Sequence, residues 1–104
     1  MKPASPDSKK EAEESPAAFY ALIRGRVQGV GYRYQAIREA ERLKINGWVR
    51  NTYSGDVEVW AEGTRENLET FRIWLHRGPP YSRVDSVDLE PKTPKGYKGF
   101  DVKF

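Results

Sequence analysis

The sequence of 104 residues predicts a single α+β domain with the element order β-α-β-β-α-β and one short additional strand at the C-terminal end. Two observations carry this prediction. Apolar residues recur at helical spacing in two segments, and five other segments are short apolar or alternating runs typical of strands. Each helical segment also lies between strands, and right-handed crossovers turn that order into a ferredoxin-like sandwich. We therefore expect an antiparallel sheet with both helices packed on one of its faces.

The N-terminal residues differ in composition from the rest of the chain. Residues 1–18 mix Lys, Glu, Ser and Pro, with no apolar residue larger than alanine after Met1. This composition is typical of a disordered tail, so we expect the folded domain to span residues 19–104. The sequence has neither the apolar stretch of a secretory signal nor an uncharged run long enough to cross a bilayer. We expect a soluble, cytoplasmic protein.

The first half of the domain is predicted to hold a strand, a glycine-rich loop and a helix. Residues 19–24 form an apolar run that Gly25 ends, as in a buried strand. From residue 32 to residue 44 the apolar side chains fall on one face of a helix. The pair Asn46-Gly47 is a typical helix end, so we expect the helix to stop there.

The second half is predicted to begin with a β-hairpin. Residues 48–53 and 57–62 are strand-like, and Ser54-Gly55-Asp56 between them forms the turn. A second helix follows, with Thr64 as its N-cap and Gly78-Pro79-Pro80 as its end. The remaining predicted strands are residues 83–90 and 100–104.

Composition and charge exclude several chemistries. The sequence contains no cysteine and a single histidine, so cysteine nucleophiles, thiolate metal sites and a cluster of histidine ligands are excluded. That histidine, His76, lies near the end of the second predicted helix, where positive charge suits the helix dipole, and we expect no catalytic role for it. The formal net charge is +3, and seven basic side chains lie between Arg24 and Arg50 against only two acidic ones. This region should attract anions.

The loop Gly25-Arg26-Val27-Gln28-Gly29-Val30-Gly31-Tyr32-Arg33 lies between the first strand and the first helix. Glycines at positions 29 and 31 can adopt backbone conformations that turn successive N–H groups toward one ligand, next to the unpaired amides of the helix start. Arg33 adds a guanidinium whose two-pronged shape matches two phosphate oxygens. The spacing predicts an anion-binding loop.

The same spacing excludes two common phosphate motifs. A dinucleotide fingerprint aligned on Gly29 would need a glycine at Tyr34, and the Gly-Lys-Ser/Thr of a Walker loop is missing. No Asp or Glu occurs between Ala17 and Arg38, so the loop offers neither an oxygen ligand for Mg²⁺ nor a carboxylate nucleophile. We expect a metal-free, non-covalent mechanism.

The sequence GRVQGVGYR followed by GWVRNTYSGDVEVWAEG closely resembles the acylphosphatase family. The resemblance covers roughly residues 19–104 and includes RGPP after the second helix. It implies an enzyme without a cofactor that hydrolyses acyl phosphates to a carboxylate and inorganic phosphate. It also implies that the loop amides of Gln28, Gly29, Val30, Gly31 and Tyr32, together with the Arg33 side chain, hold the phosphate, and that Asn51 orients the attacking water. Tyr32 stands where many members have Phe.

The chemistry of the substrate agrees with this residue set. An acyl phosphate expels a carboxylate, a weakly basic leaving group that needs no protonation, so a site without a general acid can cleave it. Positioning and electrostatic stabilisation are the contributions on which phosphoryl transfer depends most. The Asn51 amide oxygen can accept a hydrogen bond from water but is too weakly basic to remove its proton.

Three other classes of protein are alternatives to an acylphosphatase. RNA-recognition motifs share the β-α-β-β-α-β order of elements, but their aromatic-rich strand motif is missing here, because residues 56–62 contain only Trp60 as an aromatic residue. We therefore expect Trp48, Trp60 and Trp74 to be packing residues. A non-catalytic domain like the N-terminal part of hydrogenase-maturation carbamoyltransferases would require a long downstream chain, and a regulatory small-molecule-binding domain would leave Arg33 and Asn51 unexplained. We expect a monomer with no nucleic-acid or membrane partner.

Overall fold

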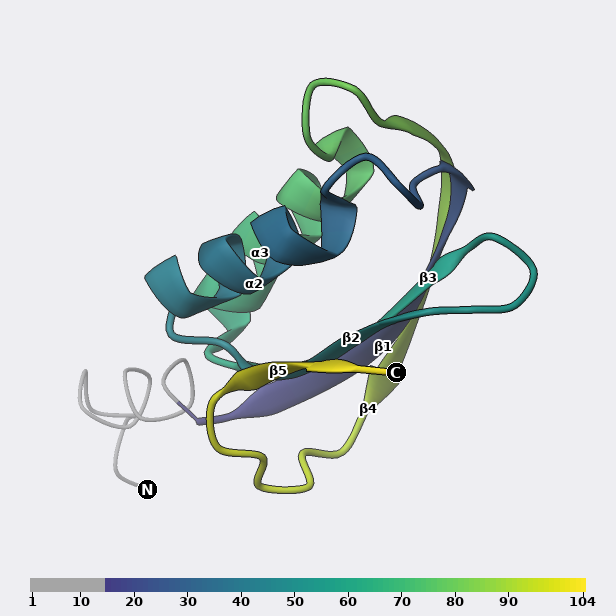
Figure 1. Ribbon diagram of the computed structural model, residues 1–104. Coiled ribbons are helices and arrows are strands. Elements are labelled where there is room, and N and C mark those ends of the chain that lie inside the picture. Colours follow the sequence, from purple (N-terminus) through teal and green to yellow (C-terminus); the bar gives the residue numbers. More distant parts are fainter. Residues whose placement is uncertain (1–14) are drawn as a thin grey trace, which may run out of the picture.

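A computed structural model describes residues 15–104 as a five-stranded sheet with two helices against one face (Figure 1). The elements are β1 (Ala17–Arg26), α2 (Tyr32–Arg42), β2 (Asn46–Asn51), β3 (Val57–Gly63), α3 (Arg65–Arg77), β4 (Arg83–Lys92) and β5 (Phe100–Lys103). The predicted α+β, ferredoxin-like fold is confirmed. Disorder is predicted for residues 1–18, and residues 1–14 of that tail lie outside the described part of the chain. Ala17 and Ala18, assigned to the tail above, pair with β3 instead.

The sheet has the strand order β4-β1-β3-β2-β5. The four strands of the predicted β-α-β-β-α-β unit are antiparallel to their neighbours, whereas β5 joins the edge parallel to β2. Because β2 and β5 run in the same direction, Arg50, the next-to-last residue of β2, lies beside Lys103, the last residue of β5, at one end of the sheet. This placement matters for the site described below.

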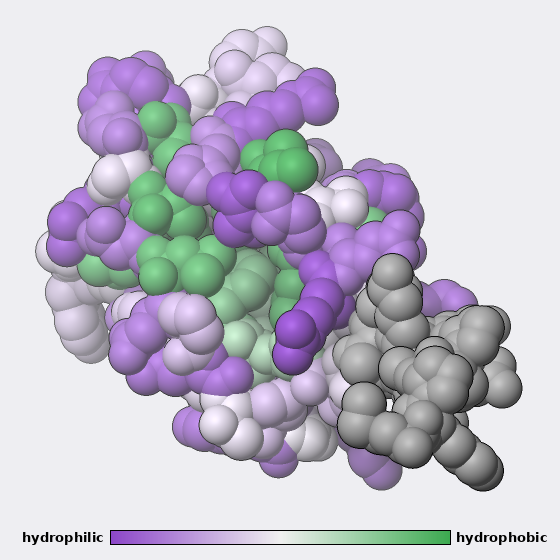
Figure 2. Space-filling model, turned by 180° about the vertical axis from the view of Figure 1, so that it is seen from behind, coloured by the Kyte–Doolittle hydropathy of each residue, from purple (hydrophilic) through white to green (hydrophobic). Residues whose placement is uncertain are grey.

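The main core fills the space between the sheet and the helices. Alternate residues of the two central strands, among them Ile23, Val57 and Val59, are fully buried. Phe71 of α3 stacks on Phe19 and packs edge-on against Phe100. The side of the molecule seen in Figure 2 has an apolar area bordered by hydrophilic residues. Neither helix of residues 15–104 is long and apolar enough to cross a membrane.

The first helix ends earlier than the sequence predicts. It stops at Arg42, and Lys44 adopts the left-handed conformation just after it, with φ of 55°. Gly47 belongs to β2, which starts and ends two residues before the predicted strand. A Cβ at Gly47 would lie 1.9 Å from the carbonyl oxygen of Trp60 on the neighbouring strand. The glycine is required by this close approach of two strands and not by a helix end.

The sheet face turned away from the helices has a small core of its own. Ala18, Trp48 and Trp60 are buried there, with Tyr20 and Tyr97 packed against them. The predicted packing role of both tryptophans on this face is therefore confirmed. Tyr97 belongs to the connection between β4 and β5, which covers part of this face.

A buried carboxylate fastens that connection to the sheet. Glu62, only 3% exposed, accepts hydrogen bonds from the backbone N–H groups of Lys95, Gly96 and Tyr97 at 2.7, 3.0 and 3.1 Å. The indole Nε1 of Trp60 donates to it at 2.7 Å. Burial alone would raise the pKa of the Glu62 carboxyl, but these four donors outweigh burial and hold the pKa below its ordinary value.

Glu62 is therefore expected to make the protein sensitive to acid. A carboxyl whose pKa is lower in the folded state stabilises the fold above its unfolded pKa of about 4.5, and that contribution disappears as the pH falls through the folded value. Glu62→Gln should lower the free energy of unfolding at pH 7 by roughly 1–3 kcal/mol and flatten its decline below about pH 4.5. Urea denaturation at several pH values measures both effects.

The exposed Glu90 provides a control, since within residues 15–104 its carboxylate forms an ion pair only with Lys92, at 3.0 Å on the surface. Glu90→Gln should change the unfolding free energy little at any pH. Equal acid sensitivity of the wild type and Glu62→Gln would contradict the assigned role of Glu62.

Candidate active site

The loop between β1 and α2 has the backbone conformations that the sequence predicts. Gly29 and Gly31 have φ angles of 74° and 81°, in the left-handed region that side chains with a Cβ disfavour. Gly31 is also the N-cap of α2, and no side chain of residues 15–104 caps the helix there. In α3, by contrast, the Thr64 side chain accepts a hydrogen bond from the N–H of Asn67. The first amides of α2 are therefore left for another acceptor.

Arg33 lies in the first turn of α2, half-buried beside this loop. Its guanidinium lies 5.6 Å from the centre of the Phe104 ring. It forms no ion pair with any carboxylate of residues 15–104. Its charge is thus not neutralised by the part of the protein that the structure describes.

Asn51 is the last residue of β2, where it pairs with Val57 of β3. Its side-chain oxygen Oδ1 is buried and accepts no hydrogen bond from the described residues. A buried amide oxygen without a donor is uncommon, because leaving it unpaired costs roughly 1–3 kcal/mol. This oxygen therefore has an acceptor site available for a bound molecule.

The loop, Arg33 and Asn51 meet around one hollow of about 330 Å³, which we call the loop hollow. Its lining residues are Val27, Gly29, Gly31, Tyr32, Arg33, Tyr34, Ile37, Asn51, Val102 and Phe104. The structure therefore brings together most of the predicted site residues, which come from segments far apart in the sequence. Gln28 and Val30 do not line it. Val30 packs against the core instead.

A second hollow of about 590 Å³, the outer hollow, adjoins the first. Its lining residues are Arg33, Arg50, Asn51, Thr52, Tyr53, Glu58, Lys103 and Phe104. Arg33, Asn51 and Phe104 border both hollows, so the two form one continuous surface around the predicted catalytic pair.

Gln28 has a role that the sequence does not reveal. Its side-chain Nε2 donates hydrogen bonds of 2.8 Å to the carbonyl oxygens of both Thr52 and Asp56. These two carbonyls belong to the turn that follows Asn51. The Gln28 side chain therefore connects the glycine-rich loop to the segment that positions Asn51. The bonded residues are 24 and 28 positions apart in the sequence, so no short motif predicts this contact.

Tyr32 ties the loop to the second helix in a similar way. Its ring is buried, and its hydroxyl donates a 2.6 Å hydrogen bond to the carbonyl oxygen of Leu75. That carbonyl lies in the last turn of α3, where helical carbonyls have no partner within the helix. Burial also raises the pKa of the Tyr32 phenol, so this residue stays a neutral donor. A phenylalanine here would keep the packing and lose the hydrogen bond.

His76 lies in the last turn of α3, as its sequence position predicts; it is exposed and lines neither hollow. Within residues 15–104, no three or more His, Cys, Asp or Glu side chains lie close enough together to hold a metal ion.

Fold and site together define a ferredoxin-like α+β domain in which a glycine-rich loop faces an arginine and an asparagine across one hollow. The family model of acylphosphatase matches residues 19–102. An acylphosphatase from Thermococcus kodakarensis is 48% identical over 80 residues, which covers 77% of this chain and 88% of the relative. The chain belongs to the acylphosphatase family and is, like its members, an enzyme.

Comparison with solved structures supports the same family assignment. The crystal structure of acylphosphatase from Bacillus subtilis matches with a TM-score of 0.83 at 34% identity, covering 85% of this chain and 99% of that one. Full-length HypF matches with a TM-score of 0.78 at 26% identity over 88% of this chain, but over only 12% of its own length. The chain is thus similar to a complete small enzyme and also to one segment of a much larger protein.

Proposed function

We propose that this protein hydrolyses the carboxyl–phosphate anhydride bond of acyl phosphates by in-line attack of a water molecule on the phosphorus. The observation that carries the proposal is the meeting of Gly29, Gly31, Arg33 and Asn51 around the loop hollow. In this reaction the water oxygen bonds to phosphorus, the bond between phosphorus and the bridging oxygen breaks, and the products are inorganic phosphate and a carboxylate.

The phosphate is held by the backbone N–H groups of residues 28–32 and by the Arg33 guanidinium. The two left-handed glycines and the uncapped start of α2 support this assignment. Arg33, without an ion pair among residues 15–104, supplies the two-pronged donor that matches two phosphoryl oxygens. These groups stabilise the charge that develops on the phosphoryl group in the transition state.

Asn51 orients the attacking water through its side-chain oxygen. The buried, unpaired Oδ1 supports this role, since it can accept a hydrogen bond from one water O–H. Gln28 holds the turn after Asn51 at a fixed place relative to the phosphate loop, as a positioning residue. Fixing the water and the phosphate together supplies the alignment that lowers the barrier.

The proposal predicts a metal-independent enzyme that prefers acyl phosphates to aryl phosphates. Benzoyl phosphate should be hydrolysed at the same rate with and without excess EDTA, because the loop has no carboxylate to bind a metal ion. p-Nitrophenyl phosphate should be hydrolysed far more slowly, since its phenolate leaves less readily than a carboxylate when no general acid is present. Steady-state kinetics on both substrates measures this difference.

Two outcomes would contradict the proposal. One is a rate that EDTA abolishes and Mg²⁺ restores. The other is the absence of hydrolysis of benzoyl phosphate by folded protein.

A further inference from the structure

The outer hollow, which adjoins the phosphate loop, is lined by further cationic side chains. It begins at Arg33 and Asn51 and extends to Arg50 of β2 and Lys103 of β5. The parallel pairing of the two strands places Arg50 and Lys103 side by side at the end of the sheet. A substrate whose phosphate occupies the loop hollow can place its acyl group in this adjoining space, because the two hollows share Arg33, Asn51 and Phe104.

The side-chain charges that line the outer hollow do not cancel. Glu58 is the one carboxylate side chain lining it within residues 15–104, and it is already paired with Arg50 at 2.7 Å. Lys103 forms no ion pair with the described residues. Arg33 is assigned to the phosphate and Arg50 is paired with Glu58. Lys103 is therefore the cationic side chain of the outer hollow that is available to bind a second negative charge.

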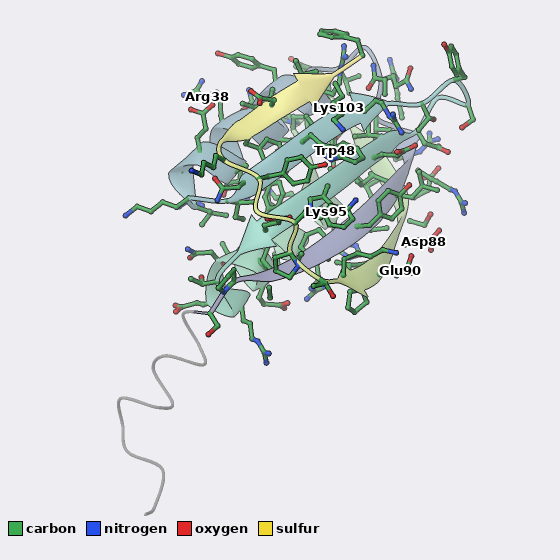
Figure 3. All side chains as sticks on the ribbon, turned by 90° about the horizontal axis from the view of Figure 1, so that it is seen from below. Arg38, Trp48, Asp88, Glu90, Lys95 and Lys103 are labelled. Atoms are coloured by element: carbon green, nitrogen blue, oxygen red, sulfur yellow. The ribbon has the colours of Figure 1, made fainter. Side chains whose placement is uncertain are left out.

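Aromatic rings hold the Lys103 ammonium in place. Its Nζ lies 4.6 Å from the centre of the Trp48 ring and 5.9 Å from that of Tyr97. Figure 3 shows Lys103 beside Trp48 on the sheet face turned away from the helices. A lysine stacked on a buried tryptophan has fewer accessible conformations than a free surface lysine, so it loses less entropy when it binds an anion.

We propose that Lys103 is a specificity residue that selects acyl phosphates whose acyl group carries a second negative charge, such as a carboxylate. The proposal rests on the proposed function and extends it from the reacting bond to the group that leaves. The carboxylate of the acyl group lies in the outer hollow against the Lys103 ammonium, while Arg33 and the loop hold the phosphate. Tyr53 and Phe104 also line the outer hollow.

Three related substrates test this inference. Benzoyl phosphate and its 3-carboxy and 4-carboxy derivatives share the same rigid ring and reacting bond, and differ in the added charge and its reach. We expect kcat/KM for at least one carboxylated substrate to exceed that for benzoyl phosphate. In Lys103→Met, which keeps an apolar side chain over Trp48, this preference should fall by roughly 5- to 10-fold. Dividing each rate by that for benzoyl phosphate in the same variant removes differences in fold stability and in the phosphate site.

Lys95→Met is the matched control. Lys95 also stacks on a tryptophan, with its Nζ 4.5 Å from the centre of the Trp60 ring, but it does not line the outer hollow. Figure 3 shows it on the same face of the sheet as Lys103. Lys95→Met should keep the wild-type preference, and Lys103→Arg, which keeps the charge, should retain most of it.

The outcomes separate the inference from the proposed function. If none of the three substrates is hydrolysed, the proposed function itself is wrong. If all are hydrolysed and Lys103→Met leaves the preference unchanged, or Lys95→Met lowers it equally, the assignment of Lys103 is overturned while the proposed function stands.

Discussion

Replacing Asn51 by alanine is expected to lower turnover by about 100-fold or more while inorganic phosphate still binds within a few fold of the wild-type affinity. The substitution removes the oxygen that orients the water and leaves the loop and Arg33 intact. It also removes a buried acceptor that has no partner among the described residues, so the fold should lose little stability. Steady-state kinetics with benzoyl phosphate and calorimetric titration with phosphate measure the two quantities separately.

Asn67→Ala is a suitable control, because Asn67 lies in α3 and lines neither hollow. It should retain wild-type turnover. If Asn51→Ala lost phosphate affinity as strongly as turnover, Asn51 would belong to the phosphate cradle and not to the water.

Replacing Arg33 by lysine is expected to weaken phosphate binding and turnover together. Lysine keeps the positive charge but cannot offer two parallel donors to two phosphoryl oxygens. Turnover should fall by about 100-fold, the effect typical of removing one preorganised contact to the transition state. The same two measurements should therefore show that both phosphate affinity and turnover fall in Arg33→Lys, whereas only turnover falls in Asn51→Ala.

Arg38 supplies the matched control on the same helix. It is exposed, with its guanidinium 5.8 Å from the centre of the Tyr34 ring, and it lines neither hollow. Arg38→Lys should leave phosphate affinity and turnover unchanged. Wild-type phosphate affinity in folded Arg33→Lys would be incompatible with the proposed cradle.

Local patterns in the sequence predict the elements of this fold well. Each strand or helix buries one face, so its apolar residues alternate in β1 and β3 and follow helical spacing in α2 and α3. These patterns are visible within each segment's own sequence. The parallel pairing of β5 with β2 is not, because an alternating strand has the same pattern in either direction. The role of Gly47 was missed for a related reason, since the strand that it approaches lies elsewhere in the chain.

The candidate site also combines features that one short segment predicts with contacts between distant segments that the sequence does not predict. Gly29, Gly31 and Arg33 lie within one short motif, so their spacing alone indicates an anion-binding loop. Joining Asn51 to them required a resemblance to a known family. The side-chain contacts of Gln28 with Thr52 and of Glu62 with residues 95–97 span more than 20 residues and follow no period. The sequence itself shows only that Glu62 and Trp60 are two residues apart and so lie on the same face of their strand.

The central claim, attack of water at phosphorus, is tested most directly by hydrolysing benzoyl phosphate in ¹⁸O-labelled water and locating the label by mass spectrometry. Attack at phosphorus forms the new bond between the water oxygen and the phosphoryl group, so the inorganic phosphate should carry one labelled oxygen and the benzoate none. The label is measured after a single turnover. A parallel incubation of the enzyme with unlabelled phosphate in the labelled water detects any exchange of oxygen between phosphate and water. Label in the benzoate would mean that water attacks the carbonyl carbon, and that result would contradict the roles assigned to both Arg33 and Asn51.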